Sequence, residues 1–205
     1  MLQRRYDVRL WVQASFLTWE PRVELHDPDP ELHDDGVRLR RWQAHDLPCV
    51  RAVSAEGQIP HGTTVPVTFT EQSGLAFIER QHGRTRDGEG WSLAIVDAVT
   101  GQAVGCIVLM LRPQGGVAGL GYWLIPTARG MGYASRAARL LSDWGLATAG
   151  LARIEAWVEP DNQASVRVLD RCGFEYEGRL RSFLAFAAQR SDALVFSRIR
   201  GTSSD

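Results

Sequence analysis

The chain has 205 residues, of which 44% are hydrophobic and 23% charged, so the sequence predicts a folded globular protein. This length suits one well-cored domain and not comfortably two. The net charge of −1 gives no general attraction to nucleic acid or to an anionic membrane surface. All 23 basic residues are arginines, which excludes a Schiff-base lysine, a pyridoxal phosphate lysine and a lysine-containing phosphate loop.

The three cysteines, Cys49, Cys106 and Cys172, lie far apart and are odd in number, which is typical of reduced thiols rather than of a disulfide scaffold or a zinc site. No hydrophobic run approaches the length of a membrane span. Polar residues such as Asp7 and Arg9 interrupt the core that a signal peptide needs. We therefore expect a cytoplasmic protein with no metal and no membrane or nucleic-acid partner.

Residues 1–35 give the weakest signals, and we interpret them as an N-terminal extension. The segment 26–35 is polar and acidic, and its histidines and carboxylates are conceivable metal ligands. Its prolines and the absence of a fixed scaffold favour a solvated linker instead. An arm that docks on its own domain, or on a second copy in a homodimer, stays an alternative.

Apolar alternation and turn signals predict the elements that follow. The expected strands are residues 37–42, 91–96, 103–111, 117–125, 153–158, 174–185 and 193–199. The expected helices are residues 46–56 with Asp46 as N-cap, a helix capped by Thr70 or Ser73 that ends near Gly83, residues 132–149 and residues 164–171. This order predicts one α+β domain over residues 36–200 with a mixed sheet, followed by a tail at 201–205.

A candidate anion site lies between the strand 117–125 and the helix that follows. Pro126 ends the strand, and Arg129, Gly130 and Gly132 form the connection. Glycines let the backbone turn tightly and bring bare N–H groups to a ligand, and the start of a helix adds its unpaired N–H groups and positive dipole. Such a place binds phosphate. The alternative is that the two glycines only make a tight turn.

These residues resemble a known family. Arg129-x-x-Gly132-x-Ala134 is similar to the Arg/Gln-x-x-Gly-x-Gly/Ala signature of the GNAT acetyltransferases, whose loop holds the pyrophosphate of acetyl-coenzyme A. The Gly-Tyr-Trp-Leu-Ile-Pro stretch at 121–126 resembles the RimJ/RimL-type branch. The downstream pattern of that branch is matched by Pro160, Asp161, Asn162, Ala164, Ser165, Gly173 and Phe174. The resemblance implies a single GNAT-type domain, with its central sheet splayed at the acetyl-CoA site and helices on both faces.

The resemblance also implies a set of site residues. The expected acetyl-CoA contacts are Trp123, Leu124, Arg129, Gly130, Met131, Gly132, Tyr133, Ala134, Asn162 and Ser165. The expected catalytic residues are Ser165, Asn162 and Glu155. From the residues alone, Asn162 and Ser165 are also explained as the start of a helix, with Asn162 as its N-cap.

The positions where the family usually carries its general acid and its general base hold other residues in this sequence. Leu169 stands where many GNAT enzymes place a tyrosine general acid, so Ser165 or water is the candidate that protonates the leaving thiolate. Gly119 stands where this branch often carries a glutamate. Glu155 and Glu159 remain as candidate bases, and the alternative is that both are surface charges.

The expected reaction is direct transfer of an acetyl group from the thioester to a primary amine. At neutral pH a lysine amine costs roughly 4–5 kcal/mol to deprotonate, whereas an α-amine costs only about 1–1.5 kcal/mol. A weak base therefore favours an N-terminal α-amine of a protein or peptide, or a small-molecule amine, and residues 58–69 are the expected specificity segment. The alternatives are a non-catalytic acyl-CoA-binding module and an antibiotic or amino-sugar acetyltransferase.

Overall fold

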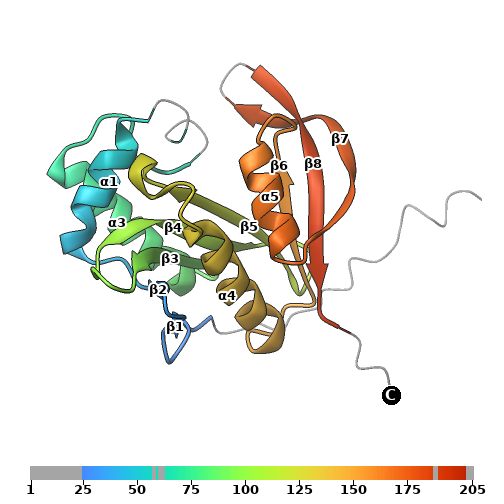
Figure 1. The fold of residues 1–205 in the computed structure, drawn as a ribbon, viewed down its shortest axis with the longest axis horizontal. Coiled ribbons are helices and arrows are strands. Elements are labelled where there is room, and N and C mark those ends of the chain that lie inside the picture. The colour runs from blue at the N-terminus through green and yellow to red at the C-terminus, as the bar shows by residue number, and fades with distance from the viewer. Residues whose placement is uncertain (1–24, 57–58, 60–62, 187–188, 202–205) are drawn as a thin grey trace, which may run out of the picture.

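A computed structural model describes residues 25–56, 59, 63–186 and 189–201. Within them, eight strands form one sheet in the order β1-β2-β3-β4-β5-β6-β8-β7 (Figure 1). The strands are β1 (Leu32–His33), β2 (Val37–Arg40), β3 (Gly90–Asp97), β4 (Ala103–Leu111), β5 (Val117–Leu124), β6 (Arg153–Val158), β7 (Glu175–Phe186) and β8 (Gln189–Ile199). Only β5 and β6 are parallel among these pairs, so the predicted mixed sheet is confirmed.

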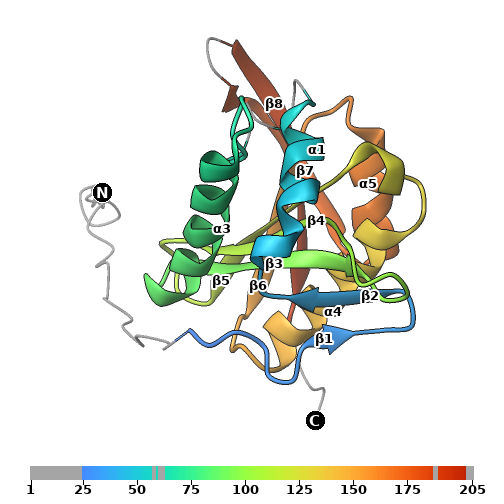
Figure 2. The ribbon, with the colours of Figure 1, turned by 90° about the vertical axis from the view of Figure 1, so that its left-hand side faces the viewer.

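Helices cover both faces of the sheet. They are α1 (Leu47–Ser54), α3 (Glu71–Arg86), α4 (Tyr133–Ala147) and α5 (Gln163–Arg171). Figure 2 shows α1 and α3 on one side of strands β2 to β5 and α4 on the other. Helix α5 packs beside α4. The expected α+β class, with helices on both faces, is therefore confirmed.

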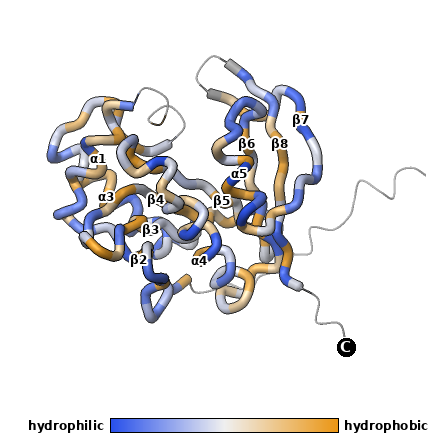
Figure 3. Tube along the Cα trace, viewed as in Figure 1, coloured by the Kyte–Doolittle hydropathy of each residue, from blue (hydrophilic) through white to orange (hydrophobic). Residues whose placement is uncertain are grey.

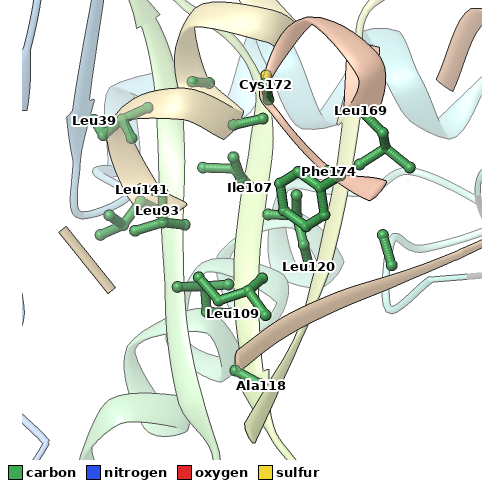
Figure 4. Packing of buried hydrophobic residues seen from close by; sticks show 14 of the residues in the cluster. Leu39, Leu93, Ile107, Leu109, Ala118, Leu120, Leu141, Leu169, Cys172 and Phe174 are labelled. Carbon is green, nitrogen blue, oxygen red and sulfur yellow. The ribbon is translucent and has the colours of Figure 1, made fainter. Parts of the chain in front are cut away.

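Each face of the sheet has its own hydrophobic core, because side chains alternate along a strand. On β5, Ala118 and Leu120 join the larger core beneath α4 and α5, whereas Trp123 joins the smaller core beneath α1 and α3. Figure 4 shows the larger core, where Leu141 of α4 and Leu169 of α5 approach side chains of the central strands. This alternation decides which β5 side chains face which side of the site.

The hydropathy of the chain follows this arrangement. In Figure 3 the edge strand β7 is largely hydrophilic, whereas β8 beside it is hydrophobic over its middle. A hydrophilic edge strand discourages pairing with another sheet. Within the described residues, no helix has both the length and the apolar character needed to cross a bilayer.

Two expectations about the first part of the domain need correction. The segment predicted as a solvated linker contains β1, which pairs with β2 through Leu32 and Leu39. Asp46 does stand at the N-cap position of α1, but its side chain does not cap that helix. Its carboxylate instead accepts hydrogen bonds from Arg40, at 2.7 and 2.8 Å, in a buried ion pair.

The boundaries of most remaining elements agree closely with those predicted, but β8 begins at Gln189 rather than at residue 193 and β2 ends at Arg40 rather than at residue 42. For α3, both cap candidates contribute: the Thr70 hydroxyl accepts from the Ser73 N–H, and the Ser73 hydroxyl accepts from the Thr70 N–H. This helix runs past Gly83 to Arg86. The extension matters, because it carries Arg84 onto the wall of a cavity described below.

Candidate active site

The loop between β5 and α4 has a backbone that requires glycine. Gly130 and Gly132 have φ angles of +78° and +89°, in the left-handed region that other residues rarely adopt. A Cβ built on either would meet no atom within 4 Å, so the glycines face open space rather than a crowded neighbour. Gly132 is the N-cap of α4 and supplies no side chain to its first turn. The first N–H groups of α4 therefore lack a cap and are available to an anion.

Arg129 ties this loop to the rest of the domain. Its guanidinium donates from Nε and Nη2 to the Leu124 carbonyl oxygen, at 3.3 and 3.2 Å, and Nη2 lies 3.0 Å from a carboxylate oxygen of Glu56. The side chain is about half exposed and lines the cavity at the loop. Arg129 thus fixes the end of β5 beside the loop, and Glu56, which lines the same cavity, balances its charge.

A cavity of about 480 Å³ extends from this loop along β5 to α5. The predicted cofactor residues that line it are Trp123, Leu124, Arg129, Gly130, Gly132, Ala134, Asn162 and Ser165. Two others point elsewhere: Met131 is 63% exposed, and the Tyr133 hydroxyl donates to the Asp97 carboxylate. The structure thus brings most of the predicted set together, and their role as cofactor contacts stays a prediction.

The sheet opens beside this cavity. Strands β5 and β6 pair at only three positions, the last of which joins Gly119 to Glu155, and then diverge (Figure 1). The N–H of Ile125 donates to the Val104 carbonyl on β4. Because N–H groups alternate between the two edges of a strand, those of Tyr122 and Leu124 point to the open side. An extended ligand can add to β5 there as a further strand.

Asn162 and Ser165 lie at the start of α5, on the far wall of the cavity. The Asn162 side-chain oxygen accepts a hydrogen bond from the Ser165 N–H at 3.1 Å, so Asn162 caps the helix. Both residues also line a smaller cavity of about 210 Å³ between the diverging ends of β5 and β6, together with Glu159. Capping and ligand contact are therefore compatible at this position.

Tyr122 is the residue that sequence reasoning missed. It lines both of these cavities and also a third, of about 530 Å³, on the α3 side of the sheet. Its hydroxyl donates to the Ser165 carbonyl at 3.5 Å. Burial raises the pKa of Tyr122 to about 12, so the hydroxyl keeps its proton at neutral pH. Its place between Gly121 and Trp123 in the branch motif was the available signal.

The third cavity lies between α3 and strands β4 and β5, and it meets the first at Tyr122 and Trp123. A buried polar network forms part of its wall: the Gln81 amide donates to Thr64, at 3.3 Å, and accepts from the Ser92 hydroxyl, at 2.9 Å. Thr64 belongs to the predicted specificity segment 58–69, of which residues 58 and 60–62 lie outside the described residues. No aspartate or glutamate is among the described residues that line this cavity.

Glu155 and Gly119 are paired on neighbouring strands and face the same side of the sheet as the third cavity. Their sequence neighbours Ile154 and Ala118 point to the other side, into the core beneath α4. The Arg112 guanidinium donates to Glu155 at 3.0 Å. A Cβ on Gly119 would lie 2.4 Å from the Arg112 Nη2. The space that a glutamate would use in the branch is therefore filled by Arg112, whose charge Glu155 balances. Glu155 as the general base stays a prediction.

Comparison with known proteins adds to this geometry. Residues 37–175 match the acetyltransferase (GNAT) domain. The uncharacterized N-acetyltransferase p20 of Bacillus licheniformis is 33% identical over 171 residues, which cover 82% of this chain and 96% of that protein. The uncharacterized N-acetyltransferase YoaA of Bacillus subtilis (strain 168) is 36% identical over 172 residues, 83% of this chain and 97% of that one. The structure of Mycobacterium smegmatis RimJ in complex with CoA-disulfide superposes with a TM-score of 0.69 at 26% identity, covering 80% of this chain and 81% of that one.

Proposed function

The chain belongs to the GNAT acetyltransferase family, in which acetyl-CoA-dependent acetylation is the general activity, and we propose that it transfers this acetyl group to an amine of low pKa. The acceptor in this proposal is the N-terminal α-amine of a protein or peptide, or an amine of a small molecule.

One observation supports the proposal most strongly: two cavities, one at the starts of α4 and α5 and the other beside α3, meet at Tyr122 and Trp123. One of them begins at the uncapped start of α4, and its glycines leave open space, so a diphosphate fits there. The other, which we call the acceptor cavity, ends at polar groups and is suited to an acceptor. A donor in the first cavity and an amine in the second reach the same point from two sides, which is the proximity that group transfer needs.

The residues at this meeting point have separate tasks in the proposed reaction. Acetyl-CoA supplies the acyl thioester. The N–H groups of Tyr122 and Leu124, on the open edge of β5, donate to the thioester oxygen and stabilise the negative charge that grows on it. Ser165 and Tyr122 line the same cavity, where we place the departing sulfur. Ser165 or water protonates the thiolate, and the Tyr122 hydroxyl donates a hydrogen bond to it.

The acceptor amine must lose a proton before it attacks. Glu155 lies on the acceptor side of the sheet, but Arg112 engages its carboxylate. The proton therefore leaves through water, towards Glu155 or Glu159. Such a relay supplies less driving force than a directly placed base, whose contribution is about 10²–10⁴-fold. This argument favours an α-amine, with a pKa of about 8, over a lysine amine, with a pKa of about 10.4.

A mass-spectrometric acetylation screen tests the proposal. Matched peptides, one with a free N-terminus and no lysine and the other with a blocked N-terminus and one lysine, are incubated with the protein and acetyl-CoA beside a panel of small amines. We expect the free α-amine or a small amine to gain about 42 Da, the mass of one acetyl group in place of a proton. Because about 1.4 kcal/mol corresponds to a tenfold change in rate, the lower cost of deprotonating an α-amine predicts acetylation at least about 100-fold faster than that of lysine. Faster lysine acetylation contradicts the acceptor assignment. Binding of CoA without transfer to any amine supports the non-catalytic alternative instead.

A further inference from the structure

Arg84 lies on the wall of the acceptor cavity without an ionic partner. It projects from the last turns of α3, and its Nη1 is 2.6 Å from the sulfur of Met110. Its Nε is buried and has no hydrogen-bond partner. A thioether sulfur is a weak acceptor. The hydrogen-bonding capacity of the Arg84 guanidinium is therefore poorly satisfied within the described part of the chain.

Two neighbouring arginines differ from Arg84, because each has a carboxylate partner. Arg86, two residues further along α3, pairs with Glu79 at 3.2 Å and with Asp87 at 3.3 Å. Arg112, which directly follows the end of β4, pairs with Glu155 at 3.0 Å. Arg84 forms no ion pair with any residue that the structure describes. Because a partly buried charge without a partner is costly, an arginine kept in this place needs another explanation.

The other groups around Arg84 cannot balance its charge. Charged lining residues of the cavity are limited to Arg84 itself among the described positions. Burial raises the pKa of the nearby Cys106 thiol to about 11, although Arg84 and Ser92 oppose this rise, so the thiol is neutral at pH 7. Gln81 already bonds Ser92 and Thr64. The guanidinium thus faces a cavity that has hydrogen-bonding groups but no anion.

We propose that Arg84 binds an anionic group of the acceptor, a carboxylate or a phosphate, so that the preferred substrate is an amine that also carries an acid. This inference rests on the proposed function, and it narrows the acceptor class. A guanidinium fork suits both kinds of anion, since each presents two oxygens in one plane.

The sheet register adds a length requirement. Met110, which Arg84 contacts, pairs with Gly119, whereas Cys106 pairs with Trp123, where the two cavities meet. These positions are four residues apart on β5, which corresponds to about 13 Å along a strand. The acid is therefore several bonds from the amine, as in the side chain of about the third residue of a peptide. A free α-amino acid, whose amine and carboxylate share one carbon, is too short.

Matched acceptors test this inference. The pairs are Ala-Ala-Glu-amide with Ala-Ala-Gln-amide, and Ala-Ala-phosphoserine-amide with Ala-Ala-Ser-amide. For the wild type we expect the anionic member of at least one pair to have a kcat/KM about 10- to 100-fold higher, mainly through KM, as for a charge-assisted hydrogen bond. The carboxylate and phosphate pairs show which anion the site takes.

Variants identify the residue responsible. Arg84→Gln is expected to lower kcat/KM for the anionic member to that of its neutral partner and to leave the neutral partner within about twofold. Arg84→Lys keeps the charge without the fork and is expected to fall between the two. Arg86→Gln, on the same helix but with its charge already paired, is expected to keep the full preference. Equal kcat/KM within every wild-type pair, or a preference that survives Arg84→Gln, would overturn the inference.

A binding measurement separates this inference from the proposed function. Calorimetric titration of each peptide into protein saturated with CoA is expected to give tighter binding of the anionic member, and Arg84→Gln is expected to abolish the difference. If no acceptor is acetylated but this difference is found, the proposed function fails and the anion site stands. If acetylation occurs without any difference, the anion site fails alone. Unchanged CoA affinity shows that each variant is folded.

Discussion

At the scale of single residues, the Tyr122 hydroxyl is the group whose role in the proposed reaction can be argued most directly. Its hydroxyl, whose pKa burial raises to about 12, lies beside Ser165 in the cofactor cavity. A thiol has a pKa of about 8.5, so a phenol of much higher pKa does not give its proton to a departing thiolate. In the proposed reaction it donates a hydrogen bond to the sulfur instead, and that bond strengthens as charge develops there.

Tyr122→Phe is therefore expected to lower kcat by about tenfold, the value of one hydrogen bond to a charged group, while the CoA dissociation constant changes by less than about twofold. Steady-state kinetics and calorimetry measure the two quantities. Tyr176→Phe on the exposed part of β7 is the matched control and is expected to change neither. An unchanged kcat in Tyr122→Phe would exclude this role.

The pH dependence of the same residue has a definite sign. Since its folded-state pKa is raised above the ordinary value of 10, the protonated hydroxyl and its contribution are fully present below pH 10 and are lost only as the pH approaches about 12. Tyr122 is thus expected to add no inflection to the kcat profile between about pH 6 and pH 9. Any inflection in that range belongs to the acceptor amine or its base.

At the scale of elements, the segment 25–35 is attached to the domain that follows it. The Trp91 indole N–H donates to the His26 carbonyl at 2.8 Å, and the Thr85 hydroxyl donates to Asp27 at 3.0 Å. Asp34 accepts hydrogen bonds from the N–H groups of Gly36 and Val37, and its carboxylate pairs with Arg136 of α4 at 2.9 Å. Residues 25–35 thus dock on their own domain, as one of the alternatives drawn from the sequence expects of the arm; its residues 1–24 lie outside the described residues.

Asp34→Ala is expected to release β1. Hydrogen exchange of the N–H groups in β1 and β2 should become about 5- to 30-fold faster, as for loss of a capping side chain worth about 1–2 kcal/mol. Asp35→Ala, at the exposed neighbouring carboxylate, is the control and should leave the exchange rates within about twofold. Equal effects of the two substitutions would show that the Asp34 contacts do not hold the arm.

The same contact predicts an acid effect. Burial alone would raise the pKa of Asp34, but the hydrogen bonds from Gly36 and Val37 and the Arg136 guanidinium lower it on balance below its ordinary value of 3.8. A carboxylate with a lowered folded-state pKa stabilises the fold above the unfolded value, and this stabilisation is lost as the pH falls through the folded one. Protection of β1 is therefore expected to persist at pH 5 and to decline below about pH 4.

At the scale of the whole molecule, local signals predicted the part of the chain from β3 to β8 well. Each of those elements has its own apolar pattern and its own turn residues, as in the loop with Gly130 and Gly132. The resemblance to the GNAT family, drawn from that loop and the residues 160–174, is confirmed, since residues 37–175 match the acetyltransferase (GNAT) domain.

The remaining features could not be predicted, because they depend on contacts between distant residues. Strand β1 has two residues and no apolar pattern, and it exists through its pairing with β2. Asp46 stands where a helix N-cap is expected from the sequence, but its carboxylate forms an ion pair with the buried Arg40 instead of capping the helix. The cavity beside α3 joins Thr64, Arg84 and Trp123 from three separate parts of the chain. The predicted specificity segment 58–69 includes Thr64, but no motif indicated Arg84.

The central claim is that the loop at Gly130 and Gly132 holds the diphosphate of CoA, and calorimetric titration of CoA into wild type, Gly132→Ala and Gly150→Ala tests it most directly. Gly132 and Gly150 flank the two ends of α4, have φ angles of +89° and +79°, and face open space, so alanine strains both by about 1 kcal/mol. We predict that the wild type and Gly150→Ala bind CoA alike and that Gly132→Ala binds at least about tenfold more weakly. Folded wild-type protein that takes up no CoA at millimolar concentration, or equal affinity in all three proteins, would contradict the account.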